Sequence, residues 1–453
     1  MAKTFRDWDV EQVMMFPPSV QDFVLEGHLA HFVRNTVVEA LDLSAIVDCY
    51  SEERGYPPYD PVMMTALLLY AYSQHIYASR RIAKACRERV DFMAITAMQT
   101  PDFRTINDFR TRHWGALQGL FVQVLRLCQE AGLVKLGHVA LDGSKIKANA
   151  SKHKAMSYDR MSKRLGELRA EVEELLRKAQ DIDEVEDKKY GKGIRGDDIP
   201  EELRFKQGRI EKIEEAKAAL EEQARQESIQ SGKVDDDGNP TGKGGGSSES
   251  LPGVPKPKQQ RNFTDPDSRI MLDGATRSFK QAYNAQAGVD CDSQIIVSVD
   301  VTQEANDKHQ LVPLIEQIEE NLGEIPDRVL TDSGYFSIDN VEYVDGNFME
   351  PFICRDRTKH SEDPQPAPRG PIPKDMSIVD RMCRKLKTKE GRKIYSKRKE
   401  SVEAVFGQIK QARGFRQFLL RGLEKVKAEW RLICLGHNLL KMWRSGRSSP
   451  TFA

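Results

Sequence analysis

Two short apolar segments that lie far apart in the chain each end on a single acidic residue, and this pattern limits the possible folds more than any other. The segment "VALDG" (139–143) ends on Asp142, and "VLTDSGY" (329–335) carries Asp332 in the same place, each acid being followed by a small residue. Both segments are typical of buried strands, where an unpaired carboxylate is costly and normally has a partner, a metal ion or a shifted pKa. Open sheets bind their ligands at the carboxyl ends of strands, which is where both acids are predicted.

The order of strand-like and helical segments predicts a mixed sheet with helices packed against it. Strand candidates lie at 134–146, twice within 283–303, at 327–336 and at 347–356, and an amphipathic helix occupies 309–323. We therefore predict an α+β (mixed) fold with a helical N-terminal domain, a five-stranded mixed sheet flanked by helices, and a long helical insertion after the first strand. The predicted boundaries are 1–130 for the N-terminal domain, 131–152 and 261–412 for the core, 153–260 for the insertion, and 413–453 for basic C-terminal helices.

The insertion is predicted to be an antiparallel helical hairpin followed by a linker. Apolar residues recur at heptad spacing in two stretches, which would be joined through "YGKGIRGDDIP"; they are Met161, Leu165, Leu168, Val172 and Leu175, then Ile210, Ile213 and Leu220. The following segment, 231–260, is rich in Gly, Ser and Pro and is predicted to be poorly ordered. An intramolecular hairpin is the simpler interpretation, and a dimerising or DNA-clamping element is the alternative.

The N-terminal region is predicted to be helical. Asp60-Pro61 is a helix cap followed by a first-turn proline, and a buried helix follows it. Further helices are predicted at 79–97, which carries Arg80 and Arg81, and from Thr105 to about 131. Two helices joined by a short turn are compatible with a helix-turn-helix DNA reader or with ordinary bundle packing, and the apolar character of the second helix favours packing.

Charge is balanced overall but not along the chain. The 453 residues include 69 basic and 69 acidic ones, yet from Asp380 to the C-terminus 20 Lys or Arg stand against 6 Asp or Glu. This local excess indicates a polyanionic partner, most simply nucleic acid, with a solvated helical surface as the alternative. The N-terminus has acids where a signal peptide needs apolar residues, and the longest apolar run is too short to span a bilayer. The seven cysteines show no C-x-x-C spacing. We therefore expect a soluble intracellular protein.

A third acid is offered by the predicted helix "SVEAVFGQIKQ" (401–411). Its buried face would leave Glu403 turned toward a sheet edge, while Lys410 reaches outward. Three convergent carboxylates suit Mg²⁺ or Mn²⁺, and two such ions can bracket a phosphodiester for in-line attack. Each acid taken alone has a simpler interpretation, because Asp142 and Asp332 would both suit a turn or cap, and Glu403 would suit an exposed pair with Lys399.

At these residues the chain resembles the DDE transposases of bacterial insertion sequences, and more narrowly the branch with a Tyr-Arg-Glu-Lys signature near the third acid. The matching segments are "VALDGSKIKANAS", "VLTDSGYF" and "IYSKRKESVEAVFGQIKQARGFRQF". "PVMMTALLLYAYSQ", "TPDFRTINDFRTRH" and "RGLEKVKAEWRLICLGHNLLKM" extend the similarity to both ends of the chain, leaving out only the insertion from 155 to 260. The resemblance implies an RNase H-like core and metal-dependent DNA chemistry.

Carried over to this sequence, the resemblance makes Asp142, Asp332 and Glu403 the catalytic metal ligands, with two Mg²⁺ or Mn²⁺ ions. Tyr395, Arg398 and Lys410 match the other signature positions and would contact transposon-end DNA. Four residues separate Arg398 from Glu403 where the family pattern has three, so Lys399 is the alternative for the arginine position, and Glu400 is a less favoured third ligand.

The predicted function is a DNA transposase that binds the terminal inverted repeats of an insertion sequence, cleaves phosphodiester bonds and joins the 3′-OH ends to target DNA. Arg80, Arg81 and the basic tail would add salt-dependent phosphate contacts. We expect a homodimer acting on double-stranded DNA in the bacterial cytoplasm, associated with the nucleoid, with no membrane partner. The alternatives are a metal-dependent nuclease without strand transfer and a domesticated DNA-binding protein that has lost its chemistry.

Overall fold

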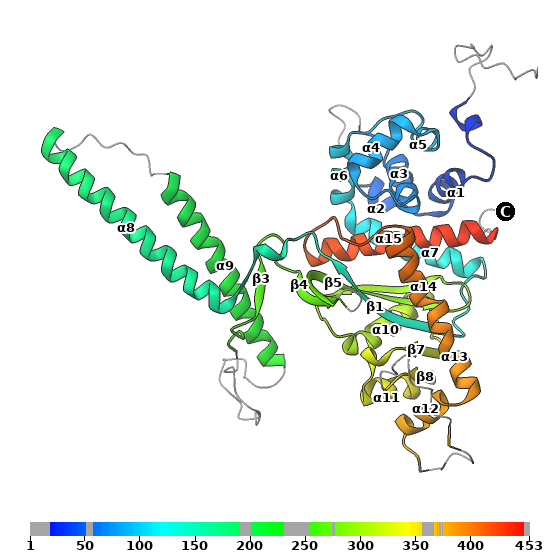
Figure 1. Cartoon of the computed structure of the whole chain (residues 1–453). Helices are drawn as coiled ribbons and strands as arrows, with labels where there is room; N and C mark the ends of the chain where they lie inside the picture. Colours follow the sequence, from blue (N-terminus) through cyan, green and yellow to red (C-terminus); the bar gives the residue numbers. More distant parts are fainter. Residues whose placement is uncertain are drawn as a thin grey trace, which may run out of the picture.

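The computed structural model describes residues 19–50, 58–190, 201–230, 253–273, 277–355, 367–368, 370, 373 and 375–447, and it describes no side chains for 178–190, 201–203 and 230. The structure has three parts (Figure 1). A group of short helices lies against a mixed sheet with its own flanking helices, and a long helical hairpin projects away from that sheet. This is the predicted α+β arrangement, with the helical insertion placed after the first strand.

The N-terminal region consists of short helices, as predicted. They are η1 (Val20–Phe23), α1 (Leu29–Asn35), η2 (Thr36–Ala40), α2 (Ser44–Val47), α3 (Pro61–Ser73), α4 (Ser79–Glu88), α5 (Val90–Thr96), α6 (Phe103–Arg112) and α7 (Trp114–Glu130). Asp60 caps α3 as expected, its side chain accepting hydrogen bonds from the Val62 and Met63 amides. The helices predicted at 79–97 and from 105 are each divided in two, because Arg89 and His113 leave helical backbone geometry.

A sheet of six strands forms the centre of the molecule. They are β1 (Val139–Lys147), β4 (Arg269–Asp273), β5 (Ser278–Asp290), β6 (Ile296–Thr302), β7 (Arg328–Thr331) and β8 (Glu350–Ile353). Their order is β4-β5-β1-β7-β8, with β6 also pairing with β5; β1 is antiparallel to β5 and parallel to β7, which is parallel to β8. Five of these strands are the predicted ones. The short β4 was not predicted.

Helices from the second half of the chain cover the sheet. They are η4 (Lys308–Gln310), α10 (Leu311–Leu322), η5 (Ser333–Tyr335), α11 (Ile338–Gly346), α12 (Ile378–Leu386), α13 (Lys389–Glu400), α14 (Val402–Gly407), η6 (Gln408–Ala412) and α15 (Leu423–Ser445). Helix α15 packs on β6, α3 and α7, so α7 and α15 lie between the N-terminal helices and the sheet (Figure 1). Because α7 is packed in this way, its role here is that of a bundle helix.

The insertion is a hairpin with a small core of its own. It comprises η3 (Lys152–Lys154), β2 (Ala155–Ser157), α8 (Tyr158–Tyr190), α9 (Glu201–Gln230) and β3 (Gln260–Asn262). Part of the predicted heptad stripe is buried between α8 and α9, namely Met161, Leu165, Leu168, Ile213 and Leu220, and Ala216 is buried with them. Strands β2 and β3 pair at the base of the hairpin. The predicted connection at 191–200 and most of the predicted linker, 231–252, lie outside the described residues.

Candidate active site

Strands β1 and β7 bring the first two acids to neighbouring positions. The parallel register pairs Leu141 with Thr331, so the next residues are Asp142 and Asp332, and β7 ends at that point. Neighbouring strands lie about 4.8 Å apart. Strand β1 continues to Lys147 along β5 while β7 does not follow it, so the two acids lie where the sheet opens.

Each of these acids also binds a nearby backbone amide. Asp332 Oδ1 accepts a hydrogen bond from the Gly334 amide at 2.8 Å and caps η5. Asp142 Oδ1 accepts one from the Gly143 amide at 2.9 Å. Asp332 is therefore a helix cap, as its simpler interpretation predicted. The same hydrogen bond fixes its carboxylate at the sheet opening, so the cap and a place in the site are compatible.

Glu403, the third acid, is connected to Asp142 through Arg398, and a break between two helices allows this contact. Helix α13 ends at Glu400 and α14 begins at Val402, and between them Ser401 has a φ of −105° and a ψ of −91°, which are not helical. Arg398 Nη2 donates to Glu403 Oε1 at 2.6 Å, and its Nη1 lies 3.7 Å from Asp142 Oδ2. The arginine side chain is 13% exposed and is thus enclosed beside the two acids.

This geometry corrects the expected pairing of Glu403. Its ionic partner is Arg398, five residues before it, whereas Lys399 is exposed on α13. The predicted single helix over 401–411 is instead α14 followed by η6, with the break before it. The break gives the extra residue between Arg398 and Glu403 a physical explanation, because a continuous helix would not align residues five apart.

Tyr395 and Lys410 both face the sheet. The Tyr395 hydroxyl donates to the Thr331 carbonyl at 3.2 Å, one residue before Asp332, and Arg398 lies over the tyrosine ring with its guanidinium carbon 5.8 Å from the ring centre. Lys410 Nζ donates to Ser144 Oγ on β1 and to the Lys145 carbonyl at 3.4 Å. The expectation that Lys410 reaches outward was therefore wrong.

Burial and neighbouring charges alter the protonation of Asp142. The pKa of Asp142 is raised to about 7, chiefly by its removal from solvent and also by Asp332 and Asp307, while the Arg398 guanidinium acts in the opposite direction. Burial lowers the pKa of Lys410. Strongly shifted titratable groups at a sheet opening are typical of a functional site.

Asp307 is an acid of this site that the sequence did not single out. It lies just before η4, and its Oδ1 accepts hydrogen bonds from Asn284 Nδ2 at 2.6 Å and Gln286 Nε2 at 2.7 Å. Its Oδ2 lies 3.5 Å from Lys145 Nζ. A signal was present in "YNAQAG", because two amide side chains alternate along an otherwise apolar strand and face one side of it.

The donors gathered here are carboxylate oxygens, which suit hard divalent cations such as Mg²⁺ and Mn²⁺. Among the described residues, no group of three acids, histidines or cysteines is close enough to enclose an ion as the side chains stand. Arg398 instead supplies a positive charge between Asp142 and Glu403. The chemistry of this donor set therefore suits a divalent ion.

The remaining sequence candidates lie elsewhere. Arg80 and Arg81 are exposed on α4 in the N-terminal helical region, with Arg80 5.0 Å from the centre of the Phe103 ring, so they are not part of the acidic site. No helix within the described ranges has the length and apolar character to cross a bilayer.

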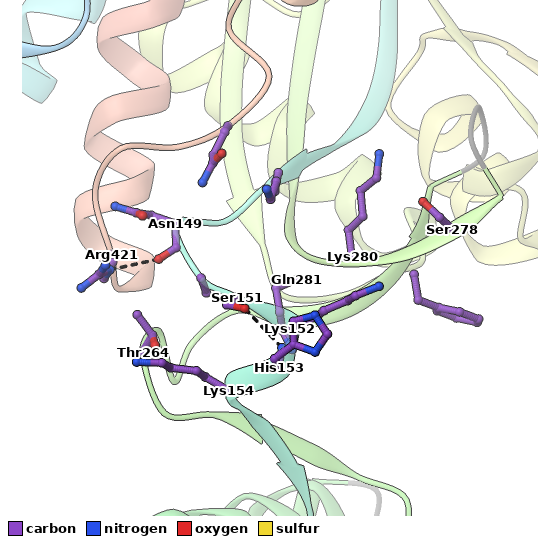
Figure 2. Close-up of a pocket in the computed structure, with 14 residues that line it drawn as sticks. Asn149, Ser151, Lys152, His153, Lys154, Thr264, Ser278, Lys280, Gln281 and Arg421 are labelled. Carbon is purple, nitrogen blue, oxygen red and sulfur yellow. Dashed lines mark hydrogen bonds between the residues drawn. The ribbon is translucent and has the colours of Figure 1, made fainter.

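A basic groove begins where β1 ends. It is a cavity of about 830 Å³ between β1, the base of the hairpin and the segment before α15 (Figure 2). Its lining contains no acidic residue, and its cationic members are Lys147, Lys152, Lys154, Lys280 and Arg421. Arg421 is held in place by donating to the Asn149 carbonyl at 3.0 Å. Strand β1 therefore connects this groove directly to Asp142.

Comparison with known proteins found two family matches and no match to a curated protein or a solved structure. The family described as "Transposase domain (DUF772)" matches residues 18–112, which cover the N-terminal helices up to α6. The family described as "Transposase DDE domain" matches residues 367–443, the segment that carries Tyr395, Arg398, Glu403 and Lys410. The chain is therefore similar to transposase domains in its N-terminal and C-terminal parts, and the C-terminal similarity is to a domain of the DDE type.

Proposed function

We propose that the protein is a DNA transposase that binds the terminal repeats of an insertion sequence, cleaves phosphodiester bonds with divalent metal ions, and transfers the freed 3′-OH ends into target DNA. The observation that carries this proposal is the β1–β7 register, which puts Asp142 beside Asp332 at the sheet opening, with Glu403 linked to Asp142 through Arg398. The DDE match over the segment that carries Glu403 supports the same reaction class.

In this proposal Asp142, Asp332 and Glu403 hold the ions, which when bound activate the attacking oxygen and stabilise the leaving one. Asp142 must be ionised to serve as a ligand, so its raised pKa makes the ion compete with a proton for this carboxylate. Arg398 leaves the carboxylates as they converge, and its guanidinium then contacts a DNA phosphate. Tyr395 holds the end of β7 through the Thr331 carbonyl and so keeps Asp332 in position.

The basic groove gives the DNA a path toward the acids. Lys147 lies five residues beyond Asp142 on the same strand, which corresponds to roughly 16 Å. One DNA strand advances about 3.4 Å along the duplex axis for each phosphate, so a duplex held in the groove would reach the acids within about five base pairs. Because the groove lining is cationic and lacks acids, it suits backbone contacts rather than base reading.

The test is cleavage and strand transfer on labelled duplexes that carry the element's own terminal repeats, with Mg²⁺. Asp142→Asn, Asp332→Asn and Glu403→Gln should keep DNA binding and lose both steps, whereas Asp345→Asn, which removes an exposed acid of α11, should behave as wild type. Nicking without transfer by the wild-type protein would favour a nuclease. Cleavage by all three active-site variants at the wild-type rate would show that the site is wrongly assigned.

Cutting two element ends in register calls for two active sites, so we include a homodimer in the proposal. Light scattering of the protein bound to terminal-repeat DNA should give a mass of two chains with two DNA ends. A mass of one chain per end would exclude this part of the proposal.

A further inference from the structure

Asp307 has the surroundings of a ligand rather than of a surface acid. Its side chain is 14% exposed, and Oδ1 is fixed by the amide hydrogens of Asn284 and Gln286. Gln286 is fixed in turn, because the buried Tyr335 hydroxyl donates to its side-chain oxygen and Trp430 Nε1 donates to its backbone carbonyl at 2.9 Å. One carboxylate oxygen is thus immobilised, and Oδ2 is left facing the site with Lys145 Nζ at 3.5 Å.

Two glycines make room for this carboxylate among the other acids. A methyl group at Gly143, the residue after Asp142, would overlap Asp307 Oδ1 and Gln286 Nε2. A methyl group at Gly334 would lie 3.0 Å from Asp332 Oδ1 and 3.2 Å from Asp307 Oδ2. An oxygen of each acid therefore approaches the same side of Gly334, where glycine leaves the space between the two carboxylates free of a side chain.

A second, independent feature points to a ligand at the same place. Asn284 is fully buried, and its Oδ1 accepts no hydrogen bond from any part of the chain that the structure describes. That oxygen lies 3.0 Å from where a methyl group on Gly143 would be, on the side of β1 where Asp307 Oδ1 also lies. A buried acceptor without a donor is costly, and a cation or its bound water would satisfy it.

We propose that Asp307 is a fourth carboxylate of the metal site, sharing a divalent ion with Asp332 beside Gly334, with the Asn284 side-chain oxygen turned toward the water shell of that ion. This inference rests on the proposed function, because it requires that the site binds a divalent cation. It adds Asp307 as a ligand and makes Asn284 and Gln286 the residues that position it. Lys145 would balance the charge of Asp307 until the ion binds.

The experiment is Mn²⁺ binding to the full-length protein, followed by electron paramagnetic resonance and calorimetry without DNA. Asp307→Asn removes the charge while its side-chain oxygen can still accept both amide hydrogens. Gly334→Ala keeps every charge and places a methyl group close to both Asp332 Oδ1 and Asp307 Oδ2. Gly346→Ala is the matched control, because nothing lies within 4 Å of a methyl group there. Asp332→Asn reports on the proposed site as a whole, and melting in EDTA checks that each variant is folded.

We expect Asp307→Asn and Gly334→Ala to weaken Mn²⁺ binding by about tenfold or more, with Gly346→Ala unchanged. Wild-type Mn²⁺ affinity in both Asp307→Asn and Gly334→Ala, together with its loss in Asp332→Asn, would overturn this inference and leave the proposed function standing. Failure of the wild-type protein to bind Mn²⁺, or an unchanged affinity in Asp332→Asn, would overturn the metal site itself. If Asp307→Asn does not fold, Gly334→Ala decides the outcome.

Discussion

Asp142 is the residue at which stability and function conflict. It lies on a central strand with a side chain that is 19% exposed, next to Asp332 and Asp307, and the Arg398 guanidinium lies 3.7 Å from it. Removing a carboxylate from water costs free energy unless a cation compensates for it fully. The chain therefore keeps a destabilising group at the place where a divalent ion would make it useful.

Asp142→Asn should stabilise the metal-free protein at alkaline pH. Because the folded-state pKa is raised from 3.8 to about 7, the folded protein holds a proton that the unfolded chain has released, and the free energy of unfolding falls as pH rises between these values. In EDTA at pH 8 we expect the variant to be more stable by about 1–3 kcal/mol, with the difference shrinking toward pH 5. Urea unfolding across this pH range measures it, and a variant less stable than wild type at pH 8 would contradict the argument.

Arg398→Gln should make the protein depend on a metal ion for stability. The variant keeps hydrogen-bonding capacity but removes the charge between Asp142 and Glu403, so in EDTA it should melt below wild type. Added Mg²⁺ should raise its melting temperature more than it raises that of wild type, because the ion replaces the lost charge. Arg398→Lys is the control that retains the charge. Equal Mg²⁺ shifts in Arg398→Gln and wild type would show that the arginine does not stand in for the ion.

At the scale of single elements, the α13–α14 break and the end of β1 decide how the site is assembled. The break at Ser401 is stabilised locally, since its hydroxyl donates to the Lys397 carbonyl at 2.8 Å. Helix α14 keeps Val402, Val405 and Phe406 in the core, and Phe406 stacks on Trp430 of α15 with ring centres 5.9 Å apart. The site's third acid is therefore carried by an element whose orientation the core determines.

Replacing the groove lysines should reduce the salt dependence of DNA binding. The triple variant Lys147→Ala, Lys152→Ala and Lys154→Ala should bind duplex DNA more weakly, and the slope of log K against log salt should decrease by about 2–3, because each lost phosphate contact accounts for about 0.9.

The matched control for the groove is a second triple variant, Lys135→Ala, Lys163→Ala and Lys212→Ala, in which the three lysines are exposed outside the groove lining. The DNA affinities of both triple variants are measured by fluorescence anisotropy at salt concentrations from about 50 to 200 mM, where phosphate contacts strongly affect affinity. An equal loss of slope in both variants would mean that overall charge, and not the groove, determines binding.

At the scale of the whole molecule, one continuous core joins the N-terminal helices, the sheet and α15, while the hairpin has a separate small core. The hairpin is attached through β2 and β3, where Ser157 pairs with Gln260. Because paired antiparallel residues lie close together, a two-residue turn can close the gap that removing the hairpin would leave.

Replacing residues 158–259 with Asn-Gly should therefore leave the main core folded. We expect cooperative thermal unfolding with a melting temperature within about 5 °C of the full chain, since a change of 1 kcal/mol corresponds to only a few degrees in a domain of this size. Circular dichroism melts test this, and the DNA affinity of the shortened chain then reports whether the hairpin contributes to binding. Loss of cooperative unfolding would show that the hairpin is part of the main folding unit.

The sequence by itself determined the element types and the positions of the acids along the chain. Apolar runs and helix periodicity identified β1, β5, β6, β7, β8 and the hairpin, because these signals depend on local spacing alone. The short strand β4 was missed because five residues beside a polar linker carry little periodicity, and its pairing with β5 is a tertiary contact.

Only the tertiary structure decided which groups meet. The β1–β7 register places Asp142 next to Asp332. Because of the break at Ser401, Glu403 forms its ion pair with Arg398 instead of Lys399. Lys410 turns toward β1 because Ser144 and the Lys145 carbonyl offer it acceptors there, and Asp307 joins the acids through side chains of β5. Local sequence specifies which chemistry a chain carries, but distances between segments far apart in sequence are set by strand pairing and core packing, which no local pattern encodes.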